Sequence, residues 1–403
     1  MTPRSPAPQE VEVRRAVDVG HSAAAVVIGA GIVGAACAYA LAIRGLSVVL
    51  VERDAPARGT SGACEGNLVL WDRPTVPDLE LTRWSHRRWE ELSGELFDAT
   101  GLDIEFDRKG SLMLAQDEAT LAAAQARCAW LAEQGVPHEW LDGAALHEVE
   151  PDLAPSIEHG ALFPMDSQIE PRIATAALVA GARARGTAVL LHEPVTSIEL
   201  RDDGRRAVVT TAEHVVETPH LVVAAGVWTP RLLAGIVDLP VSARKGQIAV
   251  VTAPIHVRHK VMEAGYAGTV ASSAGGLQIA AVVESTRSGS ILLGSSRLLT
   301  DPDDRTVDVD VLGRIVARAL EFFPGLASGR LFRSYAGLRP MSPDHAPLVG
   351  PLPGRPAVLL ATGHEGGGVM MAAATGELIA RRVTGEPIPV PDAALLPDRL
   401  VAA

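Results

Sequence analysis

The stretch AAAVVIGAGIVGAACAYALAI, residues 23–43, decides the fold because it has no charged side chain and carries three closely spaced glycines. Its length alone would permit a membrane helix. Arg14 and Arg15 upstream resemble the start of an export signal, but no small-residue cleavage site follows the apolar run. The internal pattern is a short β-branched run, a glycine turn and a helical segment, followed by a second strand, LSVVLVE. The stretch therefore predicts a βαβ dinucleotide-binding unit.

Each position of this fingerprint has a physical reason. Gly29 permits a tight turn, and Gly31 lets a pyrophosphate approach the backbone at the N-terminus of the following helix. Gly34, together with Ala38, allows the helix to pack closely on the strand. Glu52 ends the second strand, where a carboxylate accepts hydrogen bonds from an adenosine ribose. A ribose phosphate would meet repulsion there, so the pattern disfavours NADP.

The whole chain has 403 residues, enough for two or three domains. Its net charge of −12 argues against a nucleic-acid partner or an anionic membrane surface. The three cysteines lie far apart without Cys/His ligand spacing, so we expect neither a disulfide framework nor a metal site. A reduced, cytoplasmic location fits this pattern best.

Beyond the fingerprint, helical and strand-like segments alternate, and strands dominate from residue 240 onwards. The segment AVLLHEPVTSIEL, beginning at residue 188, is expected to form a strand. No second fingerprint appears, which disfavours an enzyme with separate FAD and NAD domains. The pattern predicts a nucleotide domain interrupted by a β-rich domain.

At this level the sequence resembles the D-amino-acid oxidase and glycine oxidase family of FAD-dependent oxidoreductases. The resemblance rests on the fingerprint and on four further segments: RGTSGACEGN, VVAAGVWT, GLRPMSPDHAPLVG and GHEGGG. It implies an α/β fold, in which a Rossmann-like FAD-binding domain of the GR2 type is interrupted by a β-rich α+β substrate domain.

A narrower likeness is to the flavoprotein β-subunits of heteromeric proline and hydroxyproline dehydrogenases, opine oxidases and hydrogen cyanide synthase. It rests on GACEGNLVLWD, RHKVMEAGYAGTV, VVESTRSGSILLGSSR and ATGHEGGG. The likeness implies that iron–sulfur partner subunits can carry electrons away from the flavin.

The family implies the following domain boundaries. They divide the chain into a disordered tail at 1–22; an FAD-binding domain at 23–98, 166–238 and 332–390; a substrate domain at 99–165 and 239–331; and a C-terminal tail at 391–403.

The family also implies the residues of the site. Arg339, in GLRP, matches the arginine that pairs with the substrate carboxylate, and His364 matches a position beside the flavin ring. Both are expected to be catalytic residues. The expected FAD-binding residues are Gly29, Ala30, Gly31, Ile32, Val33, Gly34, Glu52, Arg53, Thr60, Ser61, Val195, Ala225, Gly226, Gly337, Gly363, Gly366, Gly367 and Gly368.

Two departures from the family pattern matter. Glycine oxidase has GHFRNG where this chain has GHEGGG, so Gly366 replaces an arginine and glycine need not be the substrate. The cysteine that attaches flavin covalently in monomeric sarcosine oxidase has no counterpart near GLRPMSPDH, so FAD is expected to bind non-covalently.

The resulting hypothesis is oxidation of the C–N bond of an amino or imino acid, of the proline/hydroxyproline, opine, glycine or D-amino-acid class, by hydride transfer to flavin N5. We expect the chain to be the catalytic subunit of a dehydrogenase complex, without a membrane span. Two alternatives stay open: a stand-alone oxidase that produces hydrogen peroxide, and an FAD-binding relay or scaffold subunit.

Overall fold

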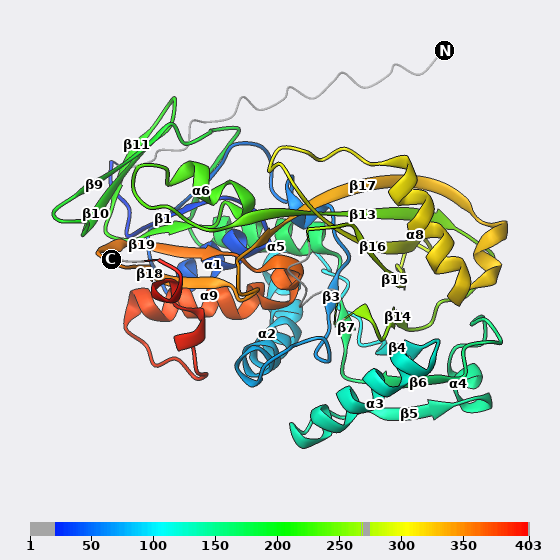
Figure 1. Ribbon diagram of the computed structural model, residues 1–403. Helices are drawn as coiled ribbons and strands as arrows, with labels where there is room; N and C mark the ends of the chain where they lie inside the picture. The colour runs from blue at the N-terminus through cyan, green and yellow to red at the C-terminus, as the bar shows by residue number, and fades with distance from the viewer. Residues whose placement is uncertain (1–20, 267, 269–274, 402–403) are drawn as a thin grey trace, which may run out of the picture.

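The computed structural model describes residues 21–266, 268 and 275–401, and its strands form two large sheets that lie side by side (Figure 1). The segment predicted to be a disordered tail lies largely outside the described residues. Within the described part of the chain, no helix combines the length and the hydropathy that crossing a bilayer requires. The stretch at 23–43 forms the predicted strand, turn and helix.

The first sheet has six strands and contains the fingerprint. Its order is β18 (Leu348–Leu352), β19 (Arg355–Thr362), β12 (Leu221–Val223), β1 (Ala25–Ile28), β2 (Val48–Glu52) and β8 (Ala188–Leu191). All neighbours are parallel except β18 and β19. Every residue of β1 is buried, as expected for a parallel strand covered on both faces.

Alternating side chains of β1 face the two covering layers. Ala25 and Val27 belong to the hydrophobic core that also contains buried residues of four helices: α1 (Ile32–Ala42), α2 (Val76–Thr100), α5 (Pro171–Ala184) and α9 (Gly368–Thr384). Val26 and Ile28 pack with a three-stranded sheet formed by β9 (Ser197–Arg201), β10 (Arg206–Thr210) and β11 (Val215–Thr218). The period of two residues along the strand therefore builds a three-layer domain.

The second sheet has eight strands. Its order is β17 (Arg330–Met341), β13 (Ser242–Thr252), β16 (Ile291–Thr300), β15 (Gln278–Ser285), β14 (Lys260–Glu263), β4 (Ser111–Ala115), β6 (His159–Phe163) and β5 (Glu139–Asp142). Helix α8 (Val309–Phe322) packs on it through Val311, Ile315, Ala319 and Phe322, which lie on one helical face.

Shorter elements complete the chain. They are β3 (Asn67–Leu68) paired with β7 (Ser167–Gln168); the helices α3 (Glu118–Glu133), α4 (Ala144–Val149) and α6 (Thr229–Leu232); and the 3₁₀ turns η1 (Thr60–Gly62), η2 (Gly226–Trp228), η3 (Pro324–Ser328), η4 (Glu365–Gly367), η5 (Ala393–Leu395) and η6 (Pro397–Arg399).

The prediction of a single strand from residue 188 is wrong, because the segment contains two strands in different sheets. Strand β8 ends at Leu191, and His192 has a φ of +63°. Pro194 lacks an N–H for a ladder hydrogen bond, and β9 begins only at Ser197. The intervening loop, residues 192–196, leaves the first sheet and turns towards the site described below.

The division into an FAD-binding and a substrate domain stays a prediction. The boundary proposed at residue 332 falls within β17, which pairs with β13 in the second sheet from Arg330 to Met341. In the region proposed as a C-terminal tail, Leu395 and Val401 are buried against the rest of the protein.

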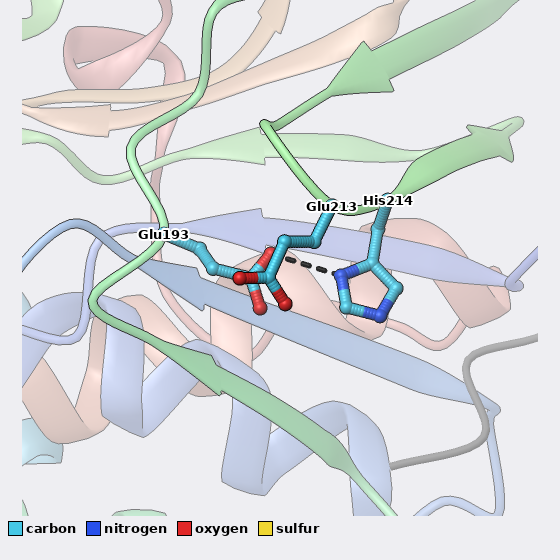
Figure 2. A group of neighbouring side chains, drawn as sticks. All are labelled: Glu193, Glu213 and His214. Atoms are coloured by element: carbon cyan, nitrogen blue, oxygen red, sulfur yellow. Dashed lines mark hydrogen bonds and ion pairs between the residues drawn. The ribbon is translucent and has the colours of Figure 1, made fainter. Parts of the chain in front are cut away.

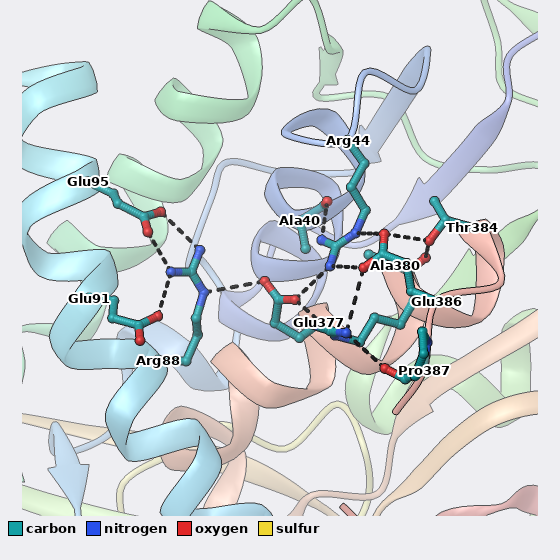
Figure 3. Close-up of polar contacts among 11 residues, drawn as sticks. Ala40, Arg44, Arg88, Glu91, Glu95, Glu377, Ala380, Thr384, Glu386 and Pro387 are labelled. Carbon is teal, nitrogen blue, oxygen red and sulfur yellow. Dashed lines mark hydrogen bonds and ion pairs between the residues drawn. The ribbon is translucent and has the colours of Figure 1, made fainter. Parts of the chain in front are cut away.

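An ion-pair network connects the end of α1 with helices α2 and α9 (Figure 3). Glu377 of α9 accepts hydrogen bonds from Arg44, beyond the end of α1, at 2.8 Å and from Arg88 of α2 at 3.3 Å. Arg88 also binds Glu95 at 2.6 Å and Glu91 at 3.1 Å on its own helix. Glu377 is therefore the partly buried anion between two cations from different elements.

Glu377→Gln should lower the free energy of unfolding by about 2–3 kcal/mol, because two partly buried guanidinium groups lose their shared carboxylate. Glu91→Gln is the matched control, since Glu91 also binds Arg88 but is largely exposed, and we expect it to cost less than about 0.5 kcal/mol. Urea unfolding of both variants measures the difference. Equal costs would contradict the role given to Glu377.

A buried carboxyl group, Asp166, holds β4 to the segment before α2. Its Oδ1 accepts the Leu70 N–H at 2.9 Å, and its Oδ2 accepts the Ser111 hydroxyl at 2.6 Å. Ser111 in turn accepts the indole N–H of Trp71 at 3.1 Å. Burial raises the pKa of Asp166 from its ordinary value of 3.8 to about 7.

The folded state therefore favours protonated Asp166, and this contribution to stability is lost as the pH rises towards 7 and above. We expect the free energy of unfolding to fall between pH 5 and pH 8 by about 1–3 kcal/mol more in the wild type than in Asp166→Asn. Denaturant titrations at the two pH values test this. The same pH dependence in both proteins would show that Asp166 titrates normally.

Candidate active site

A cavity of about 440 Å³ begins at the carboxyl ends of β1, β2 and β12 and reaches β13 and β17 of the second sheet. A ligand site at the carboxyl ends of parallel strands is the usual arrangement in open α/β sheets. The loop before α9 and the loop that follows β8 also line it.

The turn after β1 brings strand and helix into contact. Gly29 has a φ of +103°, and a Cβ there would lie 2.5 Å from the Ala224 carbonyl oxygen. A Cβ on Gly34 would lie 1.9 Å from the carbonyl oxygen of Gly29. Both positions therefore require glycine, as the fingerprint predicts.

The N-terminus of α1 faces this cavity. The first turn has no acidic side chain, and the Ile32 N–H donates to the Ser61 hydroxyl at 3.0 Å. Gly31, the N-cap residue, presents no side chain to the cavity. Free N–H groups and the helix dipole make this end suitable for phosphate.

Glu52 closes the turn at the end of β2. Its Oε2 accepts the Ala30 N–H at 2.7 Å and its Oε1 accepts the Asp54 N–H at 2.9 Å. A carboxylate offers about four acceptor positions, so two hydrogen bonds leave capacity for ribose hydroxyls. The guanidinium of Arg53 stacks 3.9 Å from the ring centroid of Trp228, and both residues line the cavity.

The structure brings most of the predicted site residues to this cavity. Those that line it are Gly29, Gly31, Ile32, Val33, Glu52, Arg53, Thr60, Ser61, Val195, Ala225, Gly226, Gly337, Arg339, His364, Gly366 and Gly368.

Ala30, Gly34, Gly363 and Gly367 do not line the cavity. Ala30 is fully buried, with its N–H bound to Glu52. Gly34 packs on Gly29, and a Cβ on Gly367 would meet the Met371 side chain at 2.3 Å. Gly363 has a φ of +75° beside the backbone of Leu348. Packing and backbone geometry explain these four small residues, and their contact with FAD stays a prediction.

Arg339 projects from β17 into the far end of the cavity. Its Nη1 donates to the Ser296 carbonyl oxygen at 2.8 Å. A Cβ on Gly246 of β13 would lie 2.4 Å from that Nη1, so the guanidinium lies against bare backbone. Burial and the nearby Arg297 lower the pKa of Arg339, yet a guanidinium stays protonated at any working pH.

Two further arginines lie near Arg339. Arg244 binds the Glu365 carboxylate at 3.1 Å, and the Arg297 Nε lies 3.7 Å from the same oxygen. Arg297 also stacks 4.5 Å from the ring centroid of Tyr266. Three guanidinium groups with the carboxylates Glu365 and Glu65 leave one positive charge, which favours an anionic ligand.

Glu365 occupies a constrained position in this group. It is buried and has a φ of +45°. Burial alone would raise the pKa of Glu365, but Arg297 and Arg339 outweigh burial and hold that pKa below its ordinary value. The carboxylate therefore remains charged between the arginines.

His364 contacts the cavity without a charged partner. One ring nitrogen is hydrogen-bonded to the Thr375 hydroxyl at 2.9 Å, and burial lowers the pKa of His364 to about 4. The ring is therefore neutral near pH 7, which is suited to packing and not to carrying a proton. Helix α9 begins four residues later, at Gly368.

Sequence reasoning did not identify five residues of this end of the cavity as functional. Glu65, Tyr266 and Glu365 line the cavity, and Arg244 and Arg297 are ion-paired with Glu365. Four of them lie within segments that resemble the family: GACEGN, AGYAGTV, GSSR and GHEGGG. That resemblance is the sequence feature that could have identified them.

A group of potential metal ligands, Glu193, Glu213 and His214, lies near the other end of the cavity (Figure 2). One Glu193 oxygen already accepts the Thr211 hydroxyl and contacts a His214 ring nitrogen, each at 2.9 Å. These hydrogen bonds connect the loop after β8 to the β10–β11 turn. They explain why the three side chains lie close together.

Comparison with known proteins agrees with this geometry. Residues 24–382 match the family model described as FAD dependent oxidoreductase. The chain is 28% identical to glycine oxidase of Bacillus licheniformis over 375 residues, covering 90% of this chain and 93% of the relative. It is 30% identical to the hydrogen cyanide synthase subunit HcnC of Pseudomonas aeruginosa over 420 residues, covering 93% and 95%.

The crystal structure of glycine oxidase from Geobacillus kaustophilus superimposes with a TM-score of 0.85 at 25% identity, covering 93% of this chain and 98% of that one. The family match spans the fingerprint, the Arg339 strand and most of helix α9. The chain belongs to the family of FAD-dependent oxidoreductases.

Proposed function

We propose that this chain oxidises the C–N bond next to the carboxylate of an amino or imino acid. The observation that carries the proposal is Arg339, a charged guanidinium that lines the cavity opposite the dinucleotide turn. Bound FAD supplies the hydride acceptor for such a reaction. The likeness to glycine oxidase over nine-tenths of the chain supports the same reaction class.

Arg339 binds the substrate carboxylate in this proposal. A planar guanidinium holds a carboxylate through two parallel hydrogen bonds, which fixes the orientation of the neighbouring carbon. Three arginines, Arg244, Arg297 and Arg339, outnumber the two carboxylates at this end of the cavity, and the excess positive charge favours an anionic group here. The Ser296 carbonyl oxygen holds the guanidinium in position before the substrate arrives.

Other residues hold the cofactor non-covalently. Gly31 and Ser61 bind the pyrophosphate at the N-terminus of α1, while Glu52 binds the ribose. The remaining proposed cofactor contacts are Gly29, Ile32, Val33, Arg53, Thr60, Val195, Ala225, Gly226, Gly337, His364, Gly366 and Gly368. His364 packs beside the flavin as a neutral ring and takes no proton.

The catalytic subunit of a dehydrogenase complex is the favoured role. The likeness to the HcnC subunit, which covers 93% of this chain, supports a place in an assembly with electron-accepting partners. The glycine oxidase relatives favour the second candidate, an oxidase that reduces oxygen. Hydrogen peroxide release by the isolated chain in air, at the rate of substrate oxidation, would identify the oxidase.

Arg339→Lys should raise the KM for the amino acid roughly 10- to 100-fold, and Arg339→Ala should raise it further, because the paired hydrogen bonds are lost. FAD content should stay at one per chain. Arg330→Ala is the control, since Arg330 lies exposed on the same strand. The proposal is contradicted if Arg339→Ala oxidises its substrate with the wild-type KM.

A further inference from the structure

Glu65 lies beside the Arg339 end of the cavity with one carboxylate oxygen unused. The residue follows η1, lines the cavity and is only 8% exposed. Its Oε2 accepts a hydrogen bond from the Asn67 side-chain amide at 3.1 Å. Its Oε1 is buried and has no hydrogen-bond partner among the residues that the structure describes.

A buried chain of polar groups sets the direction of this carboxylate. The Asn67 side-chain oxygen accepts from the Lys260 ammonium, which is also paired with the buried Glu284. Burial alone would lower the pKa of Lys260, but the Glu284 and Glu65 carboxylates together with the hydrogen bond to Glu284 raise it. Because a charged Lys260 engages the amide oxygen, the amide nitrogen of Asn67 must face Glu65.

Strand β16 of the second sheet leaves room for the Glu65 Oε1 atom at Gly294. A Cβ on Gly294 of β16 would lie 2.2 Å from the Glu65 Oε1, so the carboxylate rests against bare backbone. Two residues further along β16, the Ser296 carbonyl oxygen holds Arg339. The segment of β16 from Gly294 to Ser296 therefore contacts both Glu65 and Arg339.

Glu65 and Arg339 line the same cavity and are of opposite charge, as are the two charged groups of a zwitterion. The Glu65 charge acts on the pKa of Arg339, but no direct hydrogen bond joins the two side chains among the described residues. A buried acceptor without a partner is destabilised, and an N–H donor from a ligand removes that cost. An α-amino or imino acid offers such a donor directly next to its carboxylate.

We propose that Glu65 Oε1 accepts a hydrogen bond from the substrate nitrogen while Arg339 binds the carboxylate. This inference rests on the proposed function and narrows its substrate class. The pair selects zwitterions with a charged primary or secondary amine next to the carboxylate. It discriminates against carboxylic acids of the same shape that lack an N–H.

The test compares two pairs of ligands that differ only at the nitrogen. These are proline with tetrahydro-2-furoate, and sarcosine with methoxyacetate. Calorimetric titration of the full FAD-loaded chain, with its flavin reduced by dithionite beforehand, measures binding without turnover. Wild-type protein and the variants Glu65→Gln, Gly294→Ala and Arg339→Lys are titrated with the better-binding pair.

Glu65→Gln should weaken binding of the amino acid roughly 10- to 100-fold, the usual range for a charged hydrogen bond, and leave binding of the amine-free acid within about threefold. Gly294→Ala should produce the same selective loss by displacing the carboxylate, which provides a second test if Glu65→Gln folds poorly. Arg339→Lys should weaken both ligands.

Equal weakening of both ligands by Glu65→Gln, or no weakening of either, would overturn the assignment of Glu65. If the wild type binds neither amino acid, and none of a wider set of amino acids, the proposed function itself fails. Selective loss of amino-acid binding in Glu65→Gln and in Gly294→Ala, with loss of both ligands in Arg339→Lys, identifies Glu65 as the group that recognises the nitrogen.

Discussion

The contact between the end of β1 and the first turn of α1 is the constraint on which the rest of the site depends. Gly34 lies so close to the Gly29 carbonyl that any side chain would overlap it. Glu52 then reaches across from β2 to bind the Ala30 N–H. This arrangement presents the helix N-terminus and a carboxylate to one cavity, and it sets the position where a dinucleotide can bind.

The opposite end of the cavity is dominated by buried charge. Arg244, Arg297 and Glu365 form one group around Arg339, and Lys260 with Glu284 forms another beside Glu65. Burying these charges costs free energy, and the cost is compensated only where each charge has a partner. Arg339, Glu65 and Glu365 line the cavity. Glu365 is already paired with Arg244 and Arg297, so the substrate is assigned to Arg339 and Glu65.

The sequence predicted the strand, glycine turn and helix at one end of the cavity well, because the physics of that turn is local. Gly29, Gly34 and Glu52 lie within one βαβ unit, and the spacing of its residues determines their geometry. The sequence alone did not predict the substrate end beyond Arg339. Glu65 and Gly294 approach each other only when the second sheet forms, and nothing in their spacing indicates that contact.

The same reason explains the break in the strand expected from residue 188. Further apolar residues, Val195, Ile198 and Leu200, follow Leu191, and the segment was therefore predicted as one strand. Tertiary pairing assigns β8 to the parallel sheet and β9 to the three-stranded sheet, and the loop between them lines the cavity at Val195. A period of two residues predicts a strand but does not identify its sheet.

Anaerobic titration of the purified chain tests the central claim most directly. Proline, hydroxyprolines, sarcosine, glycine, opines and D-amino acids are added in turn, and the visible absorption band of the bound flavin is recorded. The account predicts that at least one of these compounds bleaches the band without any partner protein present. A bound flavin that none of them bleaches, or a chain that purifies and reconstitutes without flavin, would contradict it.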